Sequence, residues 1–174
     1  MDTVAPGSVL TPRSLAWWRA RPVVLGAVLT LTACALAVAW YLASPLFIRT
    51  RLAEQLAATA APLARGSFSD RDAVHRGSGT ATLLRDTTGM AFLQLSDFRV
   101  TNGPDLYVYL TPIAAPNTHD DVTRGALQVG RLKASEGGFT YELPPGADPT
   151  AYRAAVIYCL QFRTIFSIAP LTRA

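Results

Sequence analysis

The sequence predicts an all-β, β-sandwich-like domain that is preceded by a single transmembrane α-helix. Residues 22–43 contain no charged side chain, and this run is long enough to cross a bilayer core, which needs ~20 apolar residues of helix. After Gly66 the chain becomes a series of short runs rich in Thr, Val, Tyr and Phe, separated by Gly, Pro, Asn and Asp. Such a pattern is typical of β-strands and turns. No segment beyond Gly66 has the amphipathic pattern of a helix of about ten residues.

The first 43 residues are expected to form a cytoplasmic tail and a membrane anchor. Residues 1–21 contain Pro6 and Pro12 and lack helical periodicity, so we predict a tail there. The apolar run of residues 22–43 exceeds the ~7–15 residues of a signal-peptide core, which favours a retained signal-anchor over a cleaved signal peptide. Three arginines precede the run and two follow it closely. Counting positive charges therefore favours a cytoplasmic N-terminus and an extracytoplasmic domain in the cell membrane.

Residues 44–65 are expected to form a juxtamembrane stalk between the anchor and the β domain of residues 66–171. The segment Arg51–Ala61 reads RLAEQLAATAA and is rich in alanine and leucine, which have high helix propensity. We therefore predict a helix over this segment that ends at Pro62, because proline cannot continue a helix.

The β domain is expected to contain seven short strands at fairly even spacing, which favours a sandwich or a small barrel. We predict these strands at residues 79–84, 90–100, 106–110, 126–131, 139–143, 154–160 and 163–167. Turns are predicted where Gly, Pro, Asn and Asp gather, at residues 86–89, 102–105, 136–138 and 144–148. Pro112–Gly125 is the longest irregular segment, and binding loops often arise from such segments.

The net charge of +4 comes from the region around the apolar run and not from the β domain. From Gly66 onward, ten acidic residues balance ten basic residues, whereas arginines flank the apolar run on both sides. A nucleic-acid-binding domain would carry its positive charge on the folded domain, where it contacts phosphates. The charge distribution therefore argues against nucleic acid as a partner and leaves the lipid bilayer as the partner of the N-terminal helix.

Patterns of hydrolases and metal sites are missing from the sequence. There is no G-x-S-x-G motif, and the two histidines, His75 and His119, have no partner at helical spacing. We interpret both histidines as surface or loop residues and the adjacent Asp120 and Asp121 as a solvated turn. The sequence therefore predicts no metal site and identifies no cofactor. It favours a module without stand-alone enzymatic activity.

The chain has two cysteines, Cys34 in the apolar run and Cys159 in the predicted strand 154–160. If the apolar run spans the membrane, the two thiols cannot meet and the domain has no internal disulfide. Alternation along the strand gives two faces, with Ala155, Ile157 and Cys159 on one and Val156, Tyr158 and Leu160 on the other. Both faces are apolar, so we expect a central strand and an at least partly buried thiol. From the residues alone, packing is favoured over chemistry, because a buried thiol is inert.

The segment Asp97–Leu110, with the sequence DFRVTNGPDLYVYL, is the most distinctive stretch of the domain. Residues 102–105 (NGPD) have the composition of a tight turn, since Gly tolerates positive φ, Pro fixes φ, and Asn and Asp bond their own backbone. The residues that follow alternate between an apolar face and a face carrying Tyr107 and Tyr109. The pattern predicts a hairpin with one buried face.

Taken together, these residues resemble the DM-thirteen domain, also called the electron-transfer DM-thirteen domain, a small β module of secreted and membrane-anchored proteins. The resemblance covers nearly all of residues 66–171 and rests on blocks that occur in one order. The blocks are Gly66-x-Phe68, His75-x-Gly77-x-Gly79-Thr80-Ala81, Leu95-x-Asp97-Phe98, Asn102-Gly103-Pro104-Asp105-Leu106-Tyr107-Val108-Tyr109-Leu110, Gly130-x-Leu132-Lys133, Tyr141-x-Leu143-Pro144, Tyr152, Ile157-Tyr158-Cys159-x-x-Phe162 and Phe166-x-x-Ala169-Pro170-Leu171. Lys133 is the single lysine of the chain and falls on the family's lysine position.

The resemblance implies a β-sandwich that is associated with DOMON and cytochrome-type redox domains in larger architectures. It also implies a redox role centred on the cysteine that corresponds to Cys159. Neither accompanying module is recognised in these 174 residues. Electron transfer is therefore expected to require a separate redox partner protein or a cofactor that the sequence does not identify.

The sequence thus favours a membrane-anchored extracytoplasmic module with a thiol-based redox or electron-transfer role, in which Cys159 is the redox thiol or a cofactor ligand. Lys133 is the candidate for stabilising the thiolate, because it carries the charge that a thiolate needs. Asp97 and Asp105 are expected to be structural and to cap the turn that contains Asn102, Gly103 and Pro104.

The alternative function is a non-catalytic binding or scaffolding β-sandwich module at the cell surface. It would use the loop Pro112–Gly125 and the face of Tyr107 and Tyr109, because tyrosines present rigid contact area with a polar tip.

Overall fold

The computed structural model describes residues 22–47, 51–54 and 60–174. The chain divides into two compact units, Met1–Ala43 and Ser44–Ala174. The predicted cytoplasmic tail, residues 1–21, lies outside the described residues.

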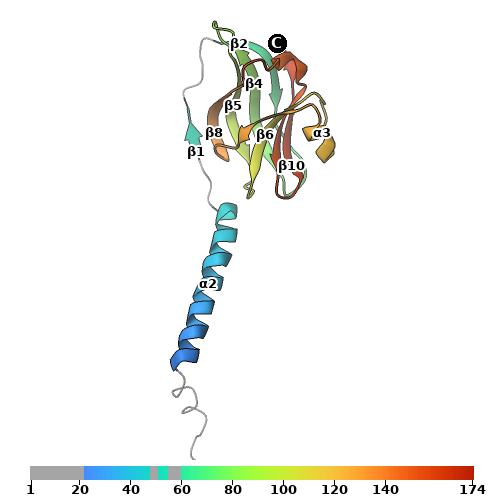
Figure 1. Ribbon diagram of the computed structural model, residues 1–174. Coiled ribbons are helices and arrows are strands. Elements are labelled where there is room, and N and C mark those ends of the chain that lie inside the picture. Colours follow the sequence, from blue (N-terminus) through green and yellow to red (C-terminus); the bar gives the residue numbers. More distant parts are fainter. Residues whose placement is uncertain (1–21, 48–50, 55–59) are drawn as a thin grey trace, which may run out of the picture. The chain divides into compact units, whose positions relative to one another are not determined.

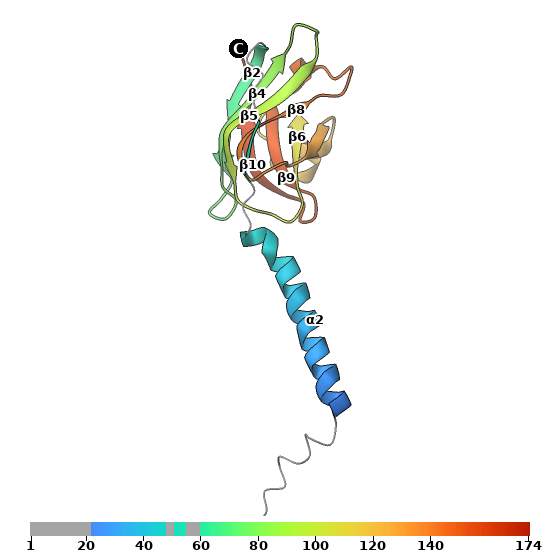
Figure 2. The same cartoon turned by 90° about the vertical axis from the view of Figure 1, so that its left-hand side faces the viewer.

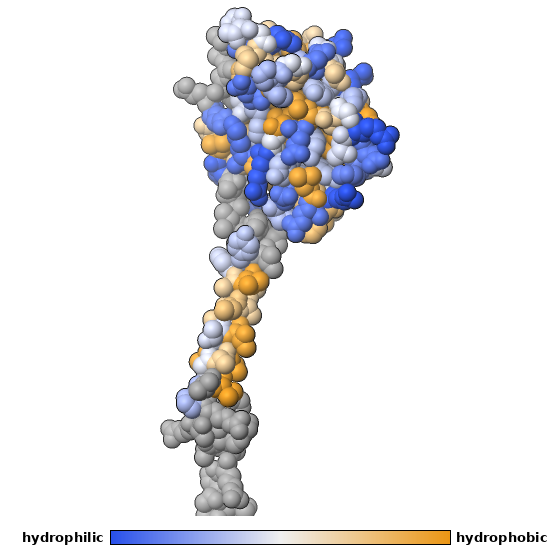
Figure 3. All heavy atoms as spheres, viewed as in Figure 1, coloured by the Kyte–Doolittle hydropathy of each residue, from blue (hydrophilic) through white to orange (hydrophobic). Residues whose placement is uncertain are grey.

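The helix α2 runs from Pro22 to Phe47, and all but its last four residues belong to the N-terminal unit. Within it, Val24–Tyr41 is long and apolar enough to cross a membrane, and none of that window is buried (Figure 3). The hydroxyls of Thr30 and Thr32 donate to carbonyls one turn earlier, each at 2.9 Å, so neither polar group depends on water. By length and composition the helix is suited to a bilayer, although a signal sequence has the same properties.

The second unit consists of two packed β-sheets (Figures 1 and 2). A six-stranded sheet has the order β1-β8-β5-β4-β2-β11, and a five-stranded sheet has the order β3-β10-β9-β6-β7. The strands are β1 Arg51–Ala53, β2 Ala61–Ser67, β3 Ser69–Asp70, β4 Gly77–Arg85, β5 Ala91–Val100, β6 Leu106–Thr111, β7 Leu127–Arg131, β8 Glu136–Glu142, β9 Ala154–Cys159, β10 Thr164–Pro170 and β11 Thr172–Arg173. The predicted fold class, a β-sandwich-like domain after one apolar helix, is confirmed.

The main hydrophobic core lies between the two sheets. Leu83, Leu93 and Leu95 of the six-stranded sheet and Val108 and Ile157 of the five-stranded sheet are fully buried in it. A second, smaller cluster covers the other face of the five-stranded sheet and includes Val122 of the short helix α3, His119–Thr123. As a result all six residues of β9 are buried, which agrees with the prediction of a central strand that is apolar on both faces.

The helix α3 lies inside the segment Pro112–Gly125, which was expected to be irregular. Its N-terminus is closed by a capping box, in which Thr118 Oγ1 accepts from the Asp121 N–H and Asp121 Oδ2 accepts from the Thr118 N–H. Asp121 is therefore a capping residue and not a solvated turn. A 3-10 helix, Pro149–Ala151, precedes β9.

The predicted stalk helix over Arg51–Ala61 is wrong. Arg51–Ala53 forms β1, which pairs in parallel with the edge of β8, and β2 begins at Ala61. Residues 55–59, on which the rest of that prediction falls, lie outside the described residues. Helix propensity is a weak preference, and pairing with a sheet edge overrides it here.

The predicted turn at residues 136–138 is also wrong, because these residues belong to β8. Gly137 has φ +125° and pairs with Leu52 of β1. A Cβ atom at Gly137 would lie 1.8 Å from the Leu52 carbonyl oxygen, so only glycine allows this close approach. Gly137 therefore serves the contact with β1, and neither it nor Gly138 ends the strand.

We predict that Gly137→Ala releases β1 from β8. The added methyl group collides with the Leu52 carbonyl, and hydrogen exchange at the amides of residues 52–54 is expected to accelerate. Gly89→Ala is the matched control, since Gly89 also has positive φ but has no atom within 4 Å of the added Cβ. It should cost about 1 kcal/mol of unfolding free energy from backbone strain alone and leave exchange at β1 unchanged. Equal exchange in both variants would contradict the prediction.

Candidate functional site

Cys159 is the last residue of β9 and is fully buried. It lies in register with Leu106 of β6 and Thr164 of β10, and its side chain belongs to the core between the sheets. The thiol is not in a disulfide. In this conformation it has no contact with solvent, and a large reagent or protein partner cannot touch it.

The turn of residues 102–105 lies beside the end of β9. The Leu160 N–H donates to the Asp105 carbonyl oxygen at 3.0 Å, directly after Cys159. A Cβ atom at Gly103 would lie 2.9 Å from side-chain atoms of both Leu106 and Phe166, so a larger residue in this turn would require those side chains to shift. The structure therefore places Cys159 beside the turn, although the two are far apart in the sequence.

His75 extends this end of the domain. Its ring packs against the Phe166 ring with 4.4 Å between centroids, and its Nδ1 lies 2.7 Å from Asp72 Oδ2. The hydrogen bond from His75, together with backbone N–H donors, lowers the pKa of Asp72 to about 2. The histidine is thus held in place by a carboxylate partner three residues earlier in the chain, in a loop that no periodic pattern marks.

The β9–β10 turn, residues 160–163, closes the same end. Arg163 has φ +51°, a conformation that non-glycine residues rarely adopt, and the Arg163 N–H reaches the Leu160 carbonyl oxygen at 3.4 Å. Phe162 is 62% exposed at the tip of the turn. The turn thus combines a backbone conformation that is unfavourable for arginine with an exposed aromatic ring, and the Thr164 hydroxyl donates to the Phe162 carbonyl oxygen at 2.9 Å within it.

Lys133 is held by the carboxylate of Glu54, which directly follows β1, and by the backbone of Thr140 in β8. Its ammonium nitrogen lies 2.9 and 3.2 Å from the two Glu54 carboxylate oxygens and 2.6 Å from the Thr140 carbonyl oxygen. The Thr140 N–H also donates to Glu54, and the hydrogen bond with Lys133 is the main reason that the pKa of Glu54 is lowered. These contacts fasten the residue after β1 to β8. The role of Lys133 beside the Cys159 thiol stays a prediction.

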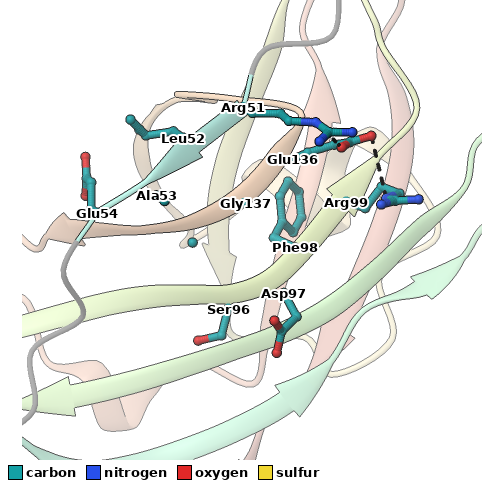
Figure 4. A pocket seen from close by; sticks show the side chains of 11 residues that line it. Arg51, Leu52, Ala53, Glu54, Ser96, Asp97, Phe98, Arg99, Glu136 and Gly137 are labelled. Atoms are coloured by element: carbon teal, nitrogen blue, oxygen red, sulfur yellow. Dashed lines mark ion pairs between the residues drawn. The ribbon is translucent and has the colours of Figure 1, made fainter.

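Asp97 lies in a bulge of β5 and not at the turn it was expected to cap. The register of β5 with β8 shifts between Leu95 and Phe98, and Asp97 has φ +50°. Asp97 lines a groove of about 710 Å³ that runs beside β1 (Figure 4). Asp105, in contrast, does belong to the turn, and its carboxylate lies 3.8 Å from the Arg131 guanidinium.

Glu136 is the buried charge of this groove. Its carboxylate lies 2.9 Å from Arg51 Nε and 3.6 Å from Arg99 Nε, and the side chain is 7% exposed (Figure 4). Arg51 belongs to β1, so this ion pair is a second attachment of β1 to β8. A buried carboxylate needs such partners, because removing an ionised group from water is costly.

A hydrogen-bonded pair of side chains, His119 and Tyr158, lies on the outer face of the five-stranded sheet. His119 Nδ1 is 2.7 Å from the Tyr158 hydroxyl oxygen, and Tyr158 is fully buried next to Cys159 in sequence. Burial is the main reason that the pKa of Tyr158 is raised. The interpretation of His119 as a surface or loop residue missed this pair. The two residues are 39 positions apart, and their meeting depends on α3 covering β9.

The tyrosine face that was expected to bind a partner is largely covered. Tyr109 is 5% exposed, and its hydroxyl donates to Gln128 Oε1 at 2.8 Å. The prediction of an accessible contact face is therefore wrong for Tyr109. Over the described residues, no group of three or more His, Cys, Asp or Glu side chains is arranged to hold a metal ion.

Comparison with protein families gives one match: the family model described as "Electron transfer DM13" matches residues 67–171. The matched region contains the turn of residues 102–105, Lys133 and Cys159, and it ends one residue after β10. No curated protein and no solved structure matches the chain.

We predict that Asp97 is needed for its backbone conformation more than for its carboxylate. Asp97→Gly should change the unfolding free energy by less than about 1 kcal/mol, because glycine adopts positive φ without strain. Asp97→Val should lower it by about 2 kcal/mol, because a β-branched residue at positive φ is strongly disfavoured. Urea unfolding of the two variants measures both values. If Asp97→Gly is the more damaging change, the carboxylate itself is important.

Proposed function

The chain belongs to the electron transfer DM13 family, and we propose that it is a membrane-anchored extracytoplasmic electron-transfer module with Cys159 as its redox thiol. The observation that carries this proposal is the family match over the whole sandwich, in which Cys159 is the single cysteine of the matched residues. A separate redox partner protein exchanges electrons with the domain. The helix α2 holds the domain at the membrane, with the N-terminal tail in the cytoplasm.

The burial of Cys159 limits how the thiol reacts. Thiol chemistry requires the sulfur to touch its reaction partner, and a fully buried thiol cannot do so. We infer that the turn of residues 160–163 opens to expose the thiol, since its strained Arg163 and its long hydrogen bond make opening inexpensive. Reactivity is then limited by the population of the open form. Cys159 is thereby protected from oxidation when no partner is bound.

A non-catalytic binding module is the second candidate function, and the groove beside β1 is the observation that favours it. The groove has a volume of about 710 Å³ and is lined by both acidic and basic residues, among them Asp97, Arg99 and Glu136. Such a surface suits a polar or charged partner. In this case Cys159 is a packing residue, and its substitution lowers stability but leaves the binding function intact.

The redox proposal is tested with the full chain in lipid nanodiscs, in a Cys34→Ser background that leaves Cys159 as the only thiol. The chain is reduced, separated from the reductant and mixed with the aromatic disulfide 5,5′-dithiobis(2-nitrobenzoate); the Cys159 thiolate attacks one sulfur to form a mixed disulfide, and the thionitrobenzoate anion that leaves is followed by absorbance. The Cys34→Ser chain is expected to reduce the reagent and release one anion per chain, and the chain that also carries Cys159→Ser is expected to lose this activity. Equal reduction by both would contradict the proposal.

The same chain tests the opening of the turn. Replacing Arg163 by glycine removes the strain, and we expect the turn to be stabilised by about 1 kcal/mol. Cys159 should then react several-fold more slowly with a maleimide, because the open form is less populated. An unchanged or faster reaction would show that Cys159 is reached by another route.

The proposed topology is tested with single cysteines in a chain that lacks both natural ones. Val74→Cys provides a site in the β domain that is strongly exposed, and Ser8→Cys provides one in the N-terminal tail. A membrane-impermeant maleimide should label position 74 in intact cells and position 8 only after permeabilisation. The opposite pattern would reverse the orientation, and a mature chain without residue 8 would identify a cleaved signal peptide.

A further inference from the structure

Tyr158 has the local chemistry of a residue that loses an electron and a proton together. Its side chain is fully buried under α3, and its hydroxyl oxygen lies 2.7 Å from His119 Nδ1. Oxidation makes a phenol strongly acidic, so the cost of removing an electron falls when a base already holds the hydrogen bond. A neutral imidazole is such a base, because one of its ring nitrogens can accept a proton.

The neighbouring Tyr109 serves as an internal comparison. Its ring lies 5.8 Å from the Tyr158 ring in an edge-to-face arrangement, and it is also buried. The Tyr109 hydroxyl, however, donates to the amide oxygen of Gln128, which is not a base at neutral pH. Of these two adjacent tyrosines, only Tyr158 can pass its proton to a basic partner.

The surroundings of the pair favour the products of such a transfer. Burial disfavours a phenolate at Tyr158, so loss of the proton without oxidation is costly. Loss of the electron without the proton would leave a buried radical cation, which is costly for the same reason. His119 is only partly buried, so an imidazolium at this position keeps part of its solvation. The carboxylates that follow it in α3 are already engaged, since Asp120 pairs with Arg124 at 3.0 Å and Asp121 caps the helix. The proton is therefore kept at the edge of the domain and remains available to return.

We propose that Tyr158 and His119 form a proton-coupled one-electron redox site on the α3 face of the sheet, distinct from Cys159. A strong one-electron oxidant, such as a high-valent metal centre, takes one electron from the Tyr158 ring. The O–H bond of Tyr158 breaks as its proton moves to His119 Nδ1, which leaves a neutral tyrosyl radical and an imidazolium. A one-electron reductant later returns the electron, and the proton moves back to Tyr158. The site does not depend on the proposed chemistry of Cys159, because the two side chains lie on opposite faces of β9.

The test uses the full chain in detergent micelles with photogenerated ruthenium(III) tris-bipyridine as the oxidant. The background variant is Tyr41→Phe, because Tyr41 is 78% exposed and would compete. Radical formation is followed by transient absorbance, and the trapped radical is identified by electron paramagnetic resonance. The variants are Tyr158→Phe, Tyr109→Phe, His119→Gln and Cys159→Ser.

The background chain is expected to give a neutral tyrosyl signal that Tyr109→Phe and Cys159→Ser retain and Tyr158→Phe loses. His119→Gln keeps a hydrogen-bond acceptor but removes the base, so the radical should form roughly a hundredfold more slowly, as expected for loss of a positioned proton acceptor. An undiminished signal in Tyr158→Phe, or an unchanged rate in His119→Gln, would overturn the proposal. Loss of the signal in Cys159→Ser would overturn the independence of the site while leaving a redox role for Cys159. If Tyr158→Phe fails to fold, the rate in His119→Gln decides the outcome.

Discussion

The burial of β9 on both of its faces is the constraint on which the domain depends. This strand lies between β10 and β6, packs into the core between the sheets on one side and is covered by α3 on the other. Because side chains alternate along a strand, consecutive residues are delivered to two separate environments. Cys159 enters the sealed core, whereas Tyr158 reaches a partly polar layer that includes His119. The two side chains for which we propose redox roles are thus adjacent in sequence but belong to different surroundings.

The sequence predicts the parts of this arrangement that local patterns determine. Alternation identified β9 as central, and the composition of residues 102–105 identified a turn, both of which agree with the structure. Patterns could not identify β1, because alanine and leucine favour a helix when no sheet edge is present. They also misjudged Gly137, which ends no strand but makes space for Leu52. The pairing of His119 with Tyr158 depends on the packing of α3, a contact between distant segments that local periodicity does not encode.

The candidate site residues divide into two groups in the structure. Cys159, Asp105 and the rest of the turn gather at one end of the five-stranded sheet, where a hydrogen bond joins Leu160 to Asp105. Lys133 and Asp97 belong to the region of β1, β5 and β8, where Lys133 holds Glu54 and Asp97 borders the groove. The motifs that carry the family resemblance therefore include residues near the Cys159 thiol and residues of the six-stranded sheet that lie elsewhere. Sequence order alone gives no means of separating the two groups.

The attachment of β1 to β8 also has a mechanical consequence. Any pull on the N-terminal helix is transmitted along the chain to Arg51 before it reaches the rest of the sandwich, and only three residue pairs join β1 to its neighbour. The two ion pairs, Arg51 with Glu136 and Lys133 with Glu54, resist this load at either end of the short strand. If the strand separates from β8, residues 51–54 are released, and they span about 13 Å when fully extended. The pairing of β8 with β5 would remain, so the tether to the domain could lengthen without unfolding of the sandwich.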